Sequence, residues 1–418
     1  MKKYISSIIL VLFFFTFLIG NFQGSYDRIA PQFLVLSTLN IVASLYLGFK
    51  YGIYKLFSDL KGSSLVITYS LYIFICIISF SVAFNKSESL IVLSQYLTFY
   101  MSFLVIYLFS LNAKINYLKL FISLSIISII IESYGVLSTA IDYFLINGNE
   151  FARSNILRGY SGNINIVSYS IAIKLPVLLY VLFRIKSKLI LTLLSMLLFF
   201  CSIIIFMLMS RGAFIAFIFV LIVVLLFKLY TSFKQNYLRA LLVSITVIMS
   251  FGITETYINQ SENNVVVERL GSLNNTQDPS INSRLRYFND AYMSIKSNPL
   301  IGIGIGNWKF YSILYDYDDM EDYIVPVYVH NDFLHTAAEI GIIGLIVFIF
   351  IFVIPLLNLM NFLKKGTYSN ESLFLILIIG VYIIDSMLNF PVSRPISYMY
   401  LIFAVVAAIK NKLDINDA

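Results

Sequence analysis

The chain contains two histidines, and His330 is the side chain best suited to proton transfer. The near-neutral pKa of imidazole would let it take the proton from a hydroxyl group as the oxygen attacks an electrophilic carbon. The alternative is that His330 only caps or orients the helix that follows. His335 is five residues further on, so on a helix it points about 140° away, and a shared metal site is not predicted. Its spacing of four residues to Glu339 predicts a structural pair instead.

Arginines form the second group of candidate residues. A guanidinium group offers a planar fork of hydrogen-bond donors that fits phosphate and carboxylate, which a lysine does not reproduce. Arg211 stands at the start of an expected helix, Arg284 lies in a Ser-Arg-Leu segment, and Arg158 precedes another helix. We predict that these three bind an anionic leaving group and neutralise its charge. For any one of them, a solvated loop arginine or a local ion pair is the alternative. The other predicted substrate contacts are Arg286, Asn331 and Arg394.

An Asp-x-Asp pattern, Asp316-Tyr317-Asp318, lies in an acidic run that also contains Asp319, Glu321 and Asp322. The pattern occurs in metal-dependent nucleotide-sugar transferases, but this chain has no nucleotide-binding α/β domain to support it. We therefore predict a solvated acidic loop and no metal ligands.

Glycines at three alternate positions, Gly302, Gly304 and Gly306, lack the strand-turn-helix context of a dinucleotide fingerprint. They predict a bend of the backbone against the membrane face, and no cofactor is expected. Gly341 and Gly344 predict close packing between helices.

These residues must be positioned by membrane-spanning helices. The 418 residues are 59% hydrophobic and only 12% charged, and the mean hydropathy is +0.87. Apolar runs of membrane-spanning length recur, and alternating barrel strands are absent. We predict an all-α integral membrane protein of about twelve helices, near residues 4–20, 31–49, 64–84, 90–110, 117–140, 164–183, 188–209, 212–229, 238–255, 333–359, 372–390 and 396–410.

Basic residues predict the orientation. With the N-terminus inside, every cytoplasmic segment contains lysine, which agrees with the positive-inside rule and places both termini in the cytoplasm. The basic residues of the outer segments are mostly arginine. The chain then divides into helices one to nine (1–255), one long extracytoplasmic loop (256–332), and helices ten to twelve with a short cytoplasmic tail (333–418). The net charge of +7 comes from short lysine clusters, so nucleic acid is not an expected partner.

The order of short motifs resembles the O-antigen ligase and polymerase superfamily. The motifs are Ser-Arg-Leu at 283–285, Asn-Pro-Leu-x-Gly-x-Gly at 298–304, His-Asn-x-x-Leu at 330–334 and Glu-x-Gly-x-x-Gly at 339–344. Two earlier segments agree with this resemblance: Ser210-Arg211-Gly212, and Arg158-Gly159 followed by Asn163 and Asn165. The resemblance implies a bacterial inner-membrane enzyme that takes a glycan from undecaprenyl pyrophosphate on the outer face and joins it to a sugar hydroxyl.

The residues lead to a compatible hypothesis. Neither ATP nor a nucleotide sugar is available outside the cell, so the donor must already be activated as a lipid-linked glycan. We predict a metal-independent, inverting glycosyltransferase that polymerises O-antigen or capsular repeat units, with ligation to a lipid A core or another final acceptor as the alternative. Its expected partners are the donor, a glycan acceptor, membrane lipids and other polysaccharide assembly proteins. A flippase or transporter is a further alternative, because Glu132 and Asp385 lie inside expected helices.

Overall fold

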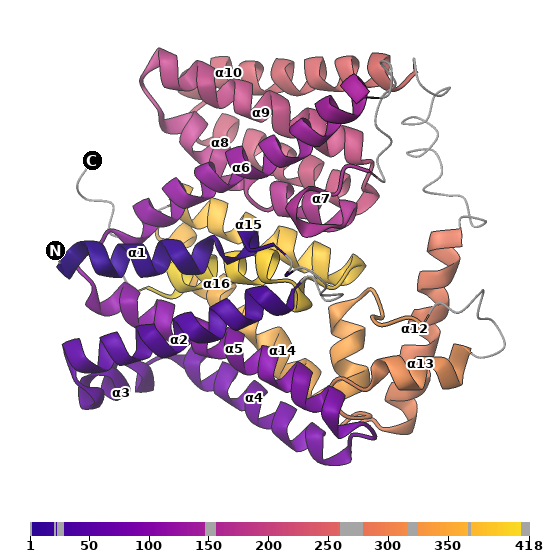
Figure 1. The fold of residues 1–418 in the computed structure, drawn as a ribbon. Helices are drawn as coiled ribbons and strands as arrows, with labels where there is room; N and C mark the ends of the chain where they lie inside the picture. The colour runs from indigo at the N-terminus through magenta and orange to yellow at the C-terminus, as the bar shows by residue number, and fades with distance from the viewer. Residues whose placement is uncertain are drawn as a thin grey trace. The chain divides into compact units, whose positions relative to one another are not determined.

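The computed structural model describes residues 2–20, 22, 29–146, 156–259, 279–316, 325–366 and 369–410, and these residues form helices and connections without a strand. Figure 1 shows the path of the chain, which divides into two compact units. The predicted all-α fold class is confirmed.

Unit 1 is built from Met1–Leu118, Thr276–Thr367 and Ser386–Ala418. In this unit α4 (Ser64–Val82) lies beside α5 (Lys86–Asn112) and also packs along α14 (Asp332–Lys364) (Figure 1). α2 and α16 pack against α5. The helices of this unit are α1 (Lys2–Phe14), η1 (Thr16–Leu18), α2 (Ala30–Tyr51), α3 (Ile53–Lys61), α4 (Ser64–Val82), α5 (Lys86–Asn112), α12 (Pro279–Ser297), α13 (Trp308–Asp316), α14 (Asp332–Lys364), η4 (Pro391–Ser393) and α16 (Pro395–Ile409).

Unit 2 is built from Lys119–Asn275 and Tyr368–Asp385. Its helices are α6 (Tyr117–Ile146), η2 (Gly159–Ser161), α7 (Ile164–Ala172), α8 (Leu175–Arg184), α9 (Lys188–Leu208), α10 (Arg211–Asn259) and most of α15 (Ser369–Leu388). α9 packs along α10, and both contact α7 and α8.

α10 contains two of the expected helices, 212–229 and 238–255. Its 49 residues contain one non-helical residue, Ser232, with φ −160° and ψ 73°. Phe206 of α9 contacts Phe217 before this point and Phe251 after it, with ring centroids 5.7 and 5.3 Å apart. Both halves of α10 therefore pack on the same neighbour, and the chain folds back at Ser232.

Nine helical spans in the described part of the chain are long and apolar enough to cross a membrane: α2, α4, α5, α6, α7 with α8, α9, α10, α14 and α15. The expected number of twelve is therefore not confirmed. α1 ends at Phe14 instead of residue 20, and α16 has 15 residues, which at 1.5 Å per residue reach about 22 Å against a hydrocarbon core of about 30 Å.

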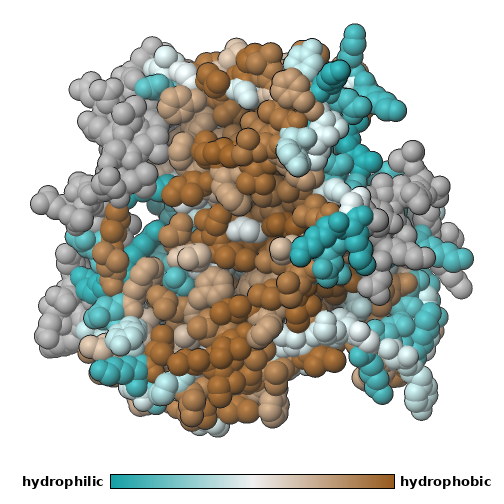
Figure 2. Space-filling model, turned by 180° about the vertical axis from the view of Figure 1, so that it is seen from behind, coloured by the Kyte–Doolittle hydropathy of each residue, from teal (hydrophilic) through white to brown (hydrophobic). Residues whose placement is uncertain are grey.

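Apolar side chains lie on the outside of these spans. Leu189, Leu226 and Ile248 are 71%, 64% and 68% exposed, and Figure 2 shows hydrophobic residues over much of the described surface on the face it presents. A water-soluble protein would not expose so large an apolar area. The chain is a multi-pass membrane protein.

The expected long loop is partly helical. α10 continues to Asn259, and α12 and α13 occupy two further stretches of the segment 256–332. Residues 260–278 and most of the acidic run, from Tyr317 to Asp322, lie outside the described residues. The extracytoplasmic location of the segment stays a prediction.

Candidate functional site

The glycine-rich segment 302–306 is held against α14 by backbone contacts. Gly341 has φ +82° and interrupts α14, and a Cβ there would lie 2.1 Å from the carbonyl oxygen of Leu300. A Cβ on Gly302 would lie 2.4 Å from the carbonyl carbon of Glu339, and one on Gly304 would lie 2.3 Å from Cα of Ala83. The predicted backbone bend is present at these glycines. Gly341 was expected to allow close packing between helices. Its positive φ instead interrupts α14 at the point where the backbone of Leu300 approaches, so the glycine makes room for a loop.

Glu339 holds the same segment in place. Its carboxylate accepts hydrogen bonds from the backbone N–H groups of Gly306 (2.8 Å) and Trp308 (2.9 Å), and His335 Nε2 lies 3.5 Å from Oε2. Glu339 is 2% exposed, so these donors satisfy a buried carboxylate. The predicted structural pairing of His335 with Glu339 is confirmed.

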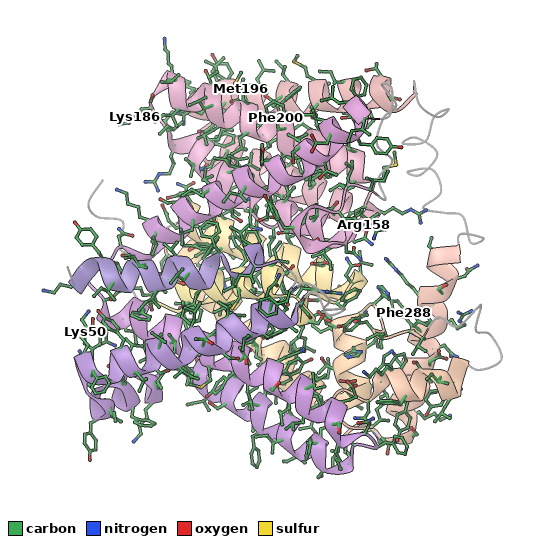
Figure 3. The ribbon with its side chains drawn as sticks, in the orientation of Figure 1. Lys50, Arg158, Lys186, Met196, Phe200 and Phe288 are labelled. Carbon is green, nitrogen blue, oxygen red and sulfur yellow. The ribbon has the colours of Figure 1, made fainter. Side chains whose placement is uncertain are left out.

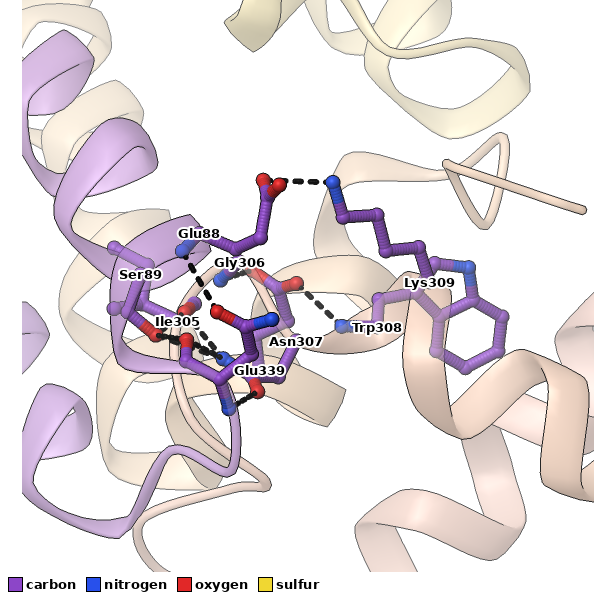
Figure 4. A network of polar contacts seen from close by, with 9 residues as sticks. Glu88, Ser89, Ile305, Gly306, Asn307, Trp308, Lys309 and Glu339 are labelled. Atoms are coloured by element: carbon purple, nitrogen blue, oxygen red, sulfur yellow. Dashed lines mark hydrogen bonds and ion pairs between the residues drawn. The ribbon is translucent and has the colours of Figure 1, made fainter.

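A second polar network joins this segment to the start of α5 (Figure 4). Asn307 accepts a hydrogen bond from the backbone N–H of Asn85 (2.7 Å) and donates to Ser89 Oγ (2.7 Å). Ser89 donates to the carbonyl oxygen of Ile305 (2.5 Å), and Lys309 forms an ion pair with Glu88 at 2.7 Å. Two helices of unit 1, α5 and α14, therefore fix the segment before α13.

His330 lies at the end of the connection that leads into α14. Its φ of 61° is in the left-handed region, which non-glycine residues rarely adopt and which often marks a functional position. The imidazole stacks on Tyr287 of α12 (centroids 6.3 Å apart, planes at 19°) and meets the edge of Phe390 at 5.0 Å. Nδ1 is buried and has no hydrogen-bond partner among the described residues.

Burial and the charge of nearby Arg284 lower the pKa of His330 from 6.5 to about 4, and His335 contributes in the same direction. Both causes oppose a second positive charge on the ring. At neutral pH the imidazole is therefore uncharged and able to accept a proton.

The predicted arginines of unit 1 gather around the same aromatic side chains. The guanidinium carbon of Arg394 lies 5.0 Å from the ring centroid of Phe390 and 6.0 Å from that of Tyr328. The rings of Tyr328 and Phe390 stack at 4.3 Å. Arg286 lies over Tyr287, 5.8 Å from the ring centroid. The structure thus brings Arg286, His330 and Arg394 against these aromatic rings, and Arg284 is near enough to His330 for its charge to act on the imidazole.

Asn331 and Asp332 begin α14. The side-chain oxygen of Asn331 accepts hydrogen bonds from the backbone N–H groups of Phe333 and Leu334, both at 3.0 Å, so Asn331 is the N-cap residue. Asp332 Oδ2 accepts a hydrogen bond from the backbone N–H of Val392 at 3.1 Å. If Asn331 contacts the substrate as predicted, it must do so through its amide nitrogen.

Arg211 and Arg158 belong to unit 2. Arg211 is the first residue of α10, preceded by buried Ser210, as the sequence predicted. Arg158 is exposed and precedes η2 (Figure 3). Asn163 caps α7 by accepting hydrogen bonds from the backbone of Asn165 (2.9 Å) and Ile166 (3.4 Å). Both arginines therefore lie at the starts of helices of one unit.

The sequence prediction missed a buried lysine. The expected helix 164–183 is broken between α7 and α8, because Pro176 lacks an N–H for the helical ladder. Lys174, at the break, forms an ion pair with Glu132 at 3.0 Å, and both side chains are 1% exposed. Ser128 and Ser170 each donate to Glu132 at 2.6 Å. The position of Lys174 inside an apolar run was the signal that could have identified it.

This ion pair carries a prediction about stability. Replacing Glu132 alone with leucine should lower the free energy of unfolding by about 3 to 5 kcal/mol, because it leaves the Lys174 charge buried without its main partner. The double variant Glu132→Leu, Lys174→Leu should recover most of that loss. Thermal unfolding in detergent compares the three proteins, and a double variant no more stable than Glu132→Leu would contradict this account.

The aromatic side chains Tyr287, Tyr328 and Phe390 were not predicted as site residues. They come from α12, from the connection before α14 and from the residue before η4, so no local pattern in the sequence connects them. The comparisons with known proteins concern the region that contains most of this cluster. Residues 195–349 match the family model described as O-antigen ligase, and a comparison with curated proteins found no match.

The matched residues run from within α9 to within α14. They include Arg211, Arg284 and His330 and leave out Arg158 and Arg394. The resemblance that the motifs indicated is confirmed for this stretch. Residues 195–349 are therefore similar to the O-antigen ligase family, within a multi-pass membrane protein.

Proposed function

We propose that this protein transfers a glycan from undecaprenyl pyrophosphate to a sugar hydroxyl at the outer face of the cytoplasmic membrane, and that it polymerises O-antigen or capsular repeat units. The observation that supports this most directly is the neutral imidazole of His330, held beside Arg284 in the region that matches O-antigen ligases. A base beside a cation is the combination that hydroxyl attack with an anionic leaving group requires.

In the proposed reaction, the acceptor hydroxyl gives its proton to His330 while its oxygen forms a bond to the anomeric carbon of the donor sugar. The bond between that carbon and the pyrophosphate oxygen breaks, and its electron pair leaves with the pyrophosphate. Attack from the side opposite the leaving group inverts the anomeric centre. Arg211, Arg284 and Arg158 would stabilise the charge that develops on the leaving group.

Arg284 also connects donor binding to the strength of the base. Its positive charge helps to lower the pKa of His330 to about 4. A bound pyrophosphate would neutralise that charge and raise the pKa of His330. The imidazole would therefore become a stronger base when the donor is in place.

Ligation to a final acceptor is the second candidate function, because the matching family model is described as O-antigen ligase. Deletion of the gene in the native host, followed by gel analysis of the glycans, separates the candidates. A polymerase deletion should leave single repeat units on the final acceptor and remove the ladder. Loss of all glycan from the acceptor would indicate a ligase, and accumulation of inward-facing lipid-linked units would indicate a flippase.

A further inference from the structure

One end of unit 2 collects basic side chains from several helices. α9 begins at this end with Lys188, two residues after Lys186, which lies at the connection from α8 (Figure 3). α10 folds back at Ser232, and both of its halves contact Phe206 near the other end of α9. The fold-back is roughly 20 to 30 Å along each half from these contacts, so it lies near the start of α9. The basic residues of this end are Arg184, Lys186, Lys188, Lys228, Lys234 and Arg239.

Two of these basic residues hold the end of the unit together. Arg239 donates hydrogen bonds to the backbone carbonyl oxygens of Phe183 and Ile185. Lys228 is only 7% exposed and donates to the side chain of Asn370, and its Nζ lies 5.6 Å from the ring centroid of Phe183. Parts of α8, α10 and α15 are therefore fixed around Phe183, and they form a framework for the other cations.

The other four cations face outward, and we call them the basic surface: Arg184, Lys186, Lys188 and Lys234. The three lysines are exposed and form no ion pair with the residues that the structure describes. Arg184 pairs with Glu371 through Nη1, but its side chain is still 45% exposed. Within the described part of the unit, one carboxylate thus meets four positive charges, and the basic surface can bind an anion from outside the chain.

Aromatic and apolar side chains adjoin the basic surface. Tyr230 and Phe233, on either side of the fold-back in α10, are 92% and 63% exposed. Exposed aromatic residues next to lysines are typical of the headgroup level of a bilayer. Leu189 and Leu226 are exposed further toward the middle of α9 and α10. Positive charge and apolar contact are therefore offered together, at the depth where the phosphate of a phospholipid lies.

We propose that the basic surface binds the phosphate group of an anionic phospholipid, in the leaflet that the positive-inside rule predicts to be the cytoplasmic one. The acyl chains would lie along the exposed apolar residues of α9 and α10. A lipid uses both parts of this surface, whereas a soluble phosphate compound uses only the cations. A zwitterionic phospholipid carries its own cation beside the phosphate, so it gains less from four positive charges. The site is at the end of unit 2 opposite Arg211 and takes no part in the proposed reaction.

The test uses the full-length protein, purified in detergent, with phosphatidylglycerol as the probe. A ligand that binds only the folded protein raises the unfolding temperature in proportion to its occupancy, so a titration followed by thermal unfolding gives an apparent affinity. The surface variant combines Lys186→Gln, Lys188→Gln and Lys234→Gln. It leaves the cations of the framework in place, so this end stays basic and the orientation in the membrane should be kept.

The matched control combines Lys55→Gln, Lys114→Gln and Lys365→Gln. These lysines are exposed and come from three different places in unit 1, and they are also predicted to face the cytoplasm. The control changes the net charge by the same amount as the surface variant. It therefore separates a local site from the general attraction between a basic protein and an anionic lipid.

We expect the surface variant to bind phosphatidylglycerol about a hundredfold more weakly than the wild type, because each lysine near an anionic lipid contributes about fivefold in affinity. The control should bind like the wild type. Phosphatidylcholine should stabilise the wild type and the surface variant to the same small extent. Glycerol 1-phosphate, which has the anionic group without the acyl chains, should not stabilise the wild type at the same concentration.

Two results would overturn the lipid site. An equal loss of affinity in the surface variant and in the control would mean that the attraction is diffuse, and equal stabilisation of the wild type by glycerol 1-phosphate would mean that the surface binds a soluble anion. If the surface variant cannot be purified in folded form, Lys234→Gln alone should bind the lipid about fivefold more weakly, and unchanged binding would count against the site. None of these measurements uses glycan transfer, so they stand apart from the proposed function.

Discussion

Replacing His330 with asparagine should reduce the initial rate of glycan transfer by about 10² to 10⁴, the usual contribution of a general base. Asparagine is preferable to alanine, because it tolerates the left-handed backbone that His330 adopts at φ 61°. The variant therefore removes the proton acceptor with little backbone strain. The measurement requires purified enzyme and lipid-linked donor, because excess enzyme in a cell would hide a moderate defect.

His335→Ala is the control for this result. His335 pairs with Glu339 and packs on the ring of Tyr328, with centroids 6.0 Å apart, and Glu339 keeps its two backbone donors in the variant. We expect much of the activity to remain. Near-normal rates for His330→Asn would falsify the assignment of the base and leave acceptor activation to a carboxylate such as Asp332 or Glu339.

The pH dependence of kcat/KM provides a second measure of the same base. With a pKa of about 4 in the free enzyme, activity should be level near neutral pH and fall only as the pH drops through about 4, where the imidazole becomes protonated. Arg284→Gln removes a nearby positive charge, so it should raise the pKa of His330 and move the acid limb to higher pH. A limb that stays in place would mean that another group titrates.

Arg211→Lys and Arg284→Lys should each slow transfer by about thirty- to a thousand-fold, although the charge is retained. A lysine lacks the forked donors of arginine, and one lost contact to a developing anion corresponds to about 2 to 4 kcal/mol of transition-state stabilisation. The comparison is of kcat for purified variants at matched protein level.

Arg239→Lys is a suitable control for these two variants. Arg239 donates hydrogen bonds to the backbone carbonyl oxygens of Phe183 and Ile185 within unit 2, so its replacement should affect thermal stability more than kcat. If both Arg211→Lys and Arg284→Lys keep full activity, neither guanidinium group takes part in binding the leaving group.

The helices that the sequence predicted well are those with an uninterrupted apolar run. The expected spans 64–84 and 188–209 correspond to α4 at Ser64–Val82 and α9 at Lys188–Leu208. The structure adds interruptions that the apolar runs did not predict. The expected span 164–183 is present as Ile164–Arg184 but is interrupted between α7 and α8, ahead of Pro176. The expected helices 212–229 and 238–255 are the two parts of α10 on either side of Ser232.

The candidate site was predicted in part, through residues adjacent in sequence. His330, Asn331 and the pair His335 and Glu339 lie close together along the chain, so their motif was readable, and the capping and pairing contacts are local. Phe390 and Lys174 could not be assigned partners in this way. Phe390 contacts His330, 60 residues away in the sequence, and Lys174 pairs with Glu132, 42 residues away. No periodic pattern in the sequence predicts contacts over such separations.

The sequence by itself determined that this is a helical membrane protein and which polar residues could do chemistry, because long apolar runs and rare charged side chains are properties of composition and order. Only the tertiary structure decided how those residues are tuned. The low pKa of His330 depends on burial and on Arg284 of α12, and the basic surface exists only where α8, α9 and α10 meet. Both depend on distances between segments that are remote along the chain, and packing alone sets those distances.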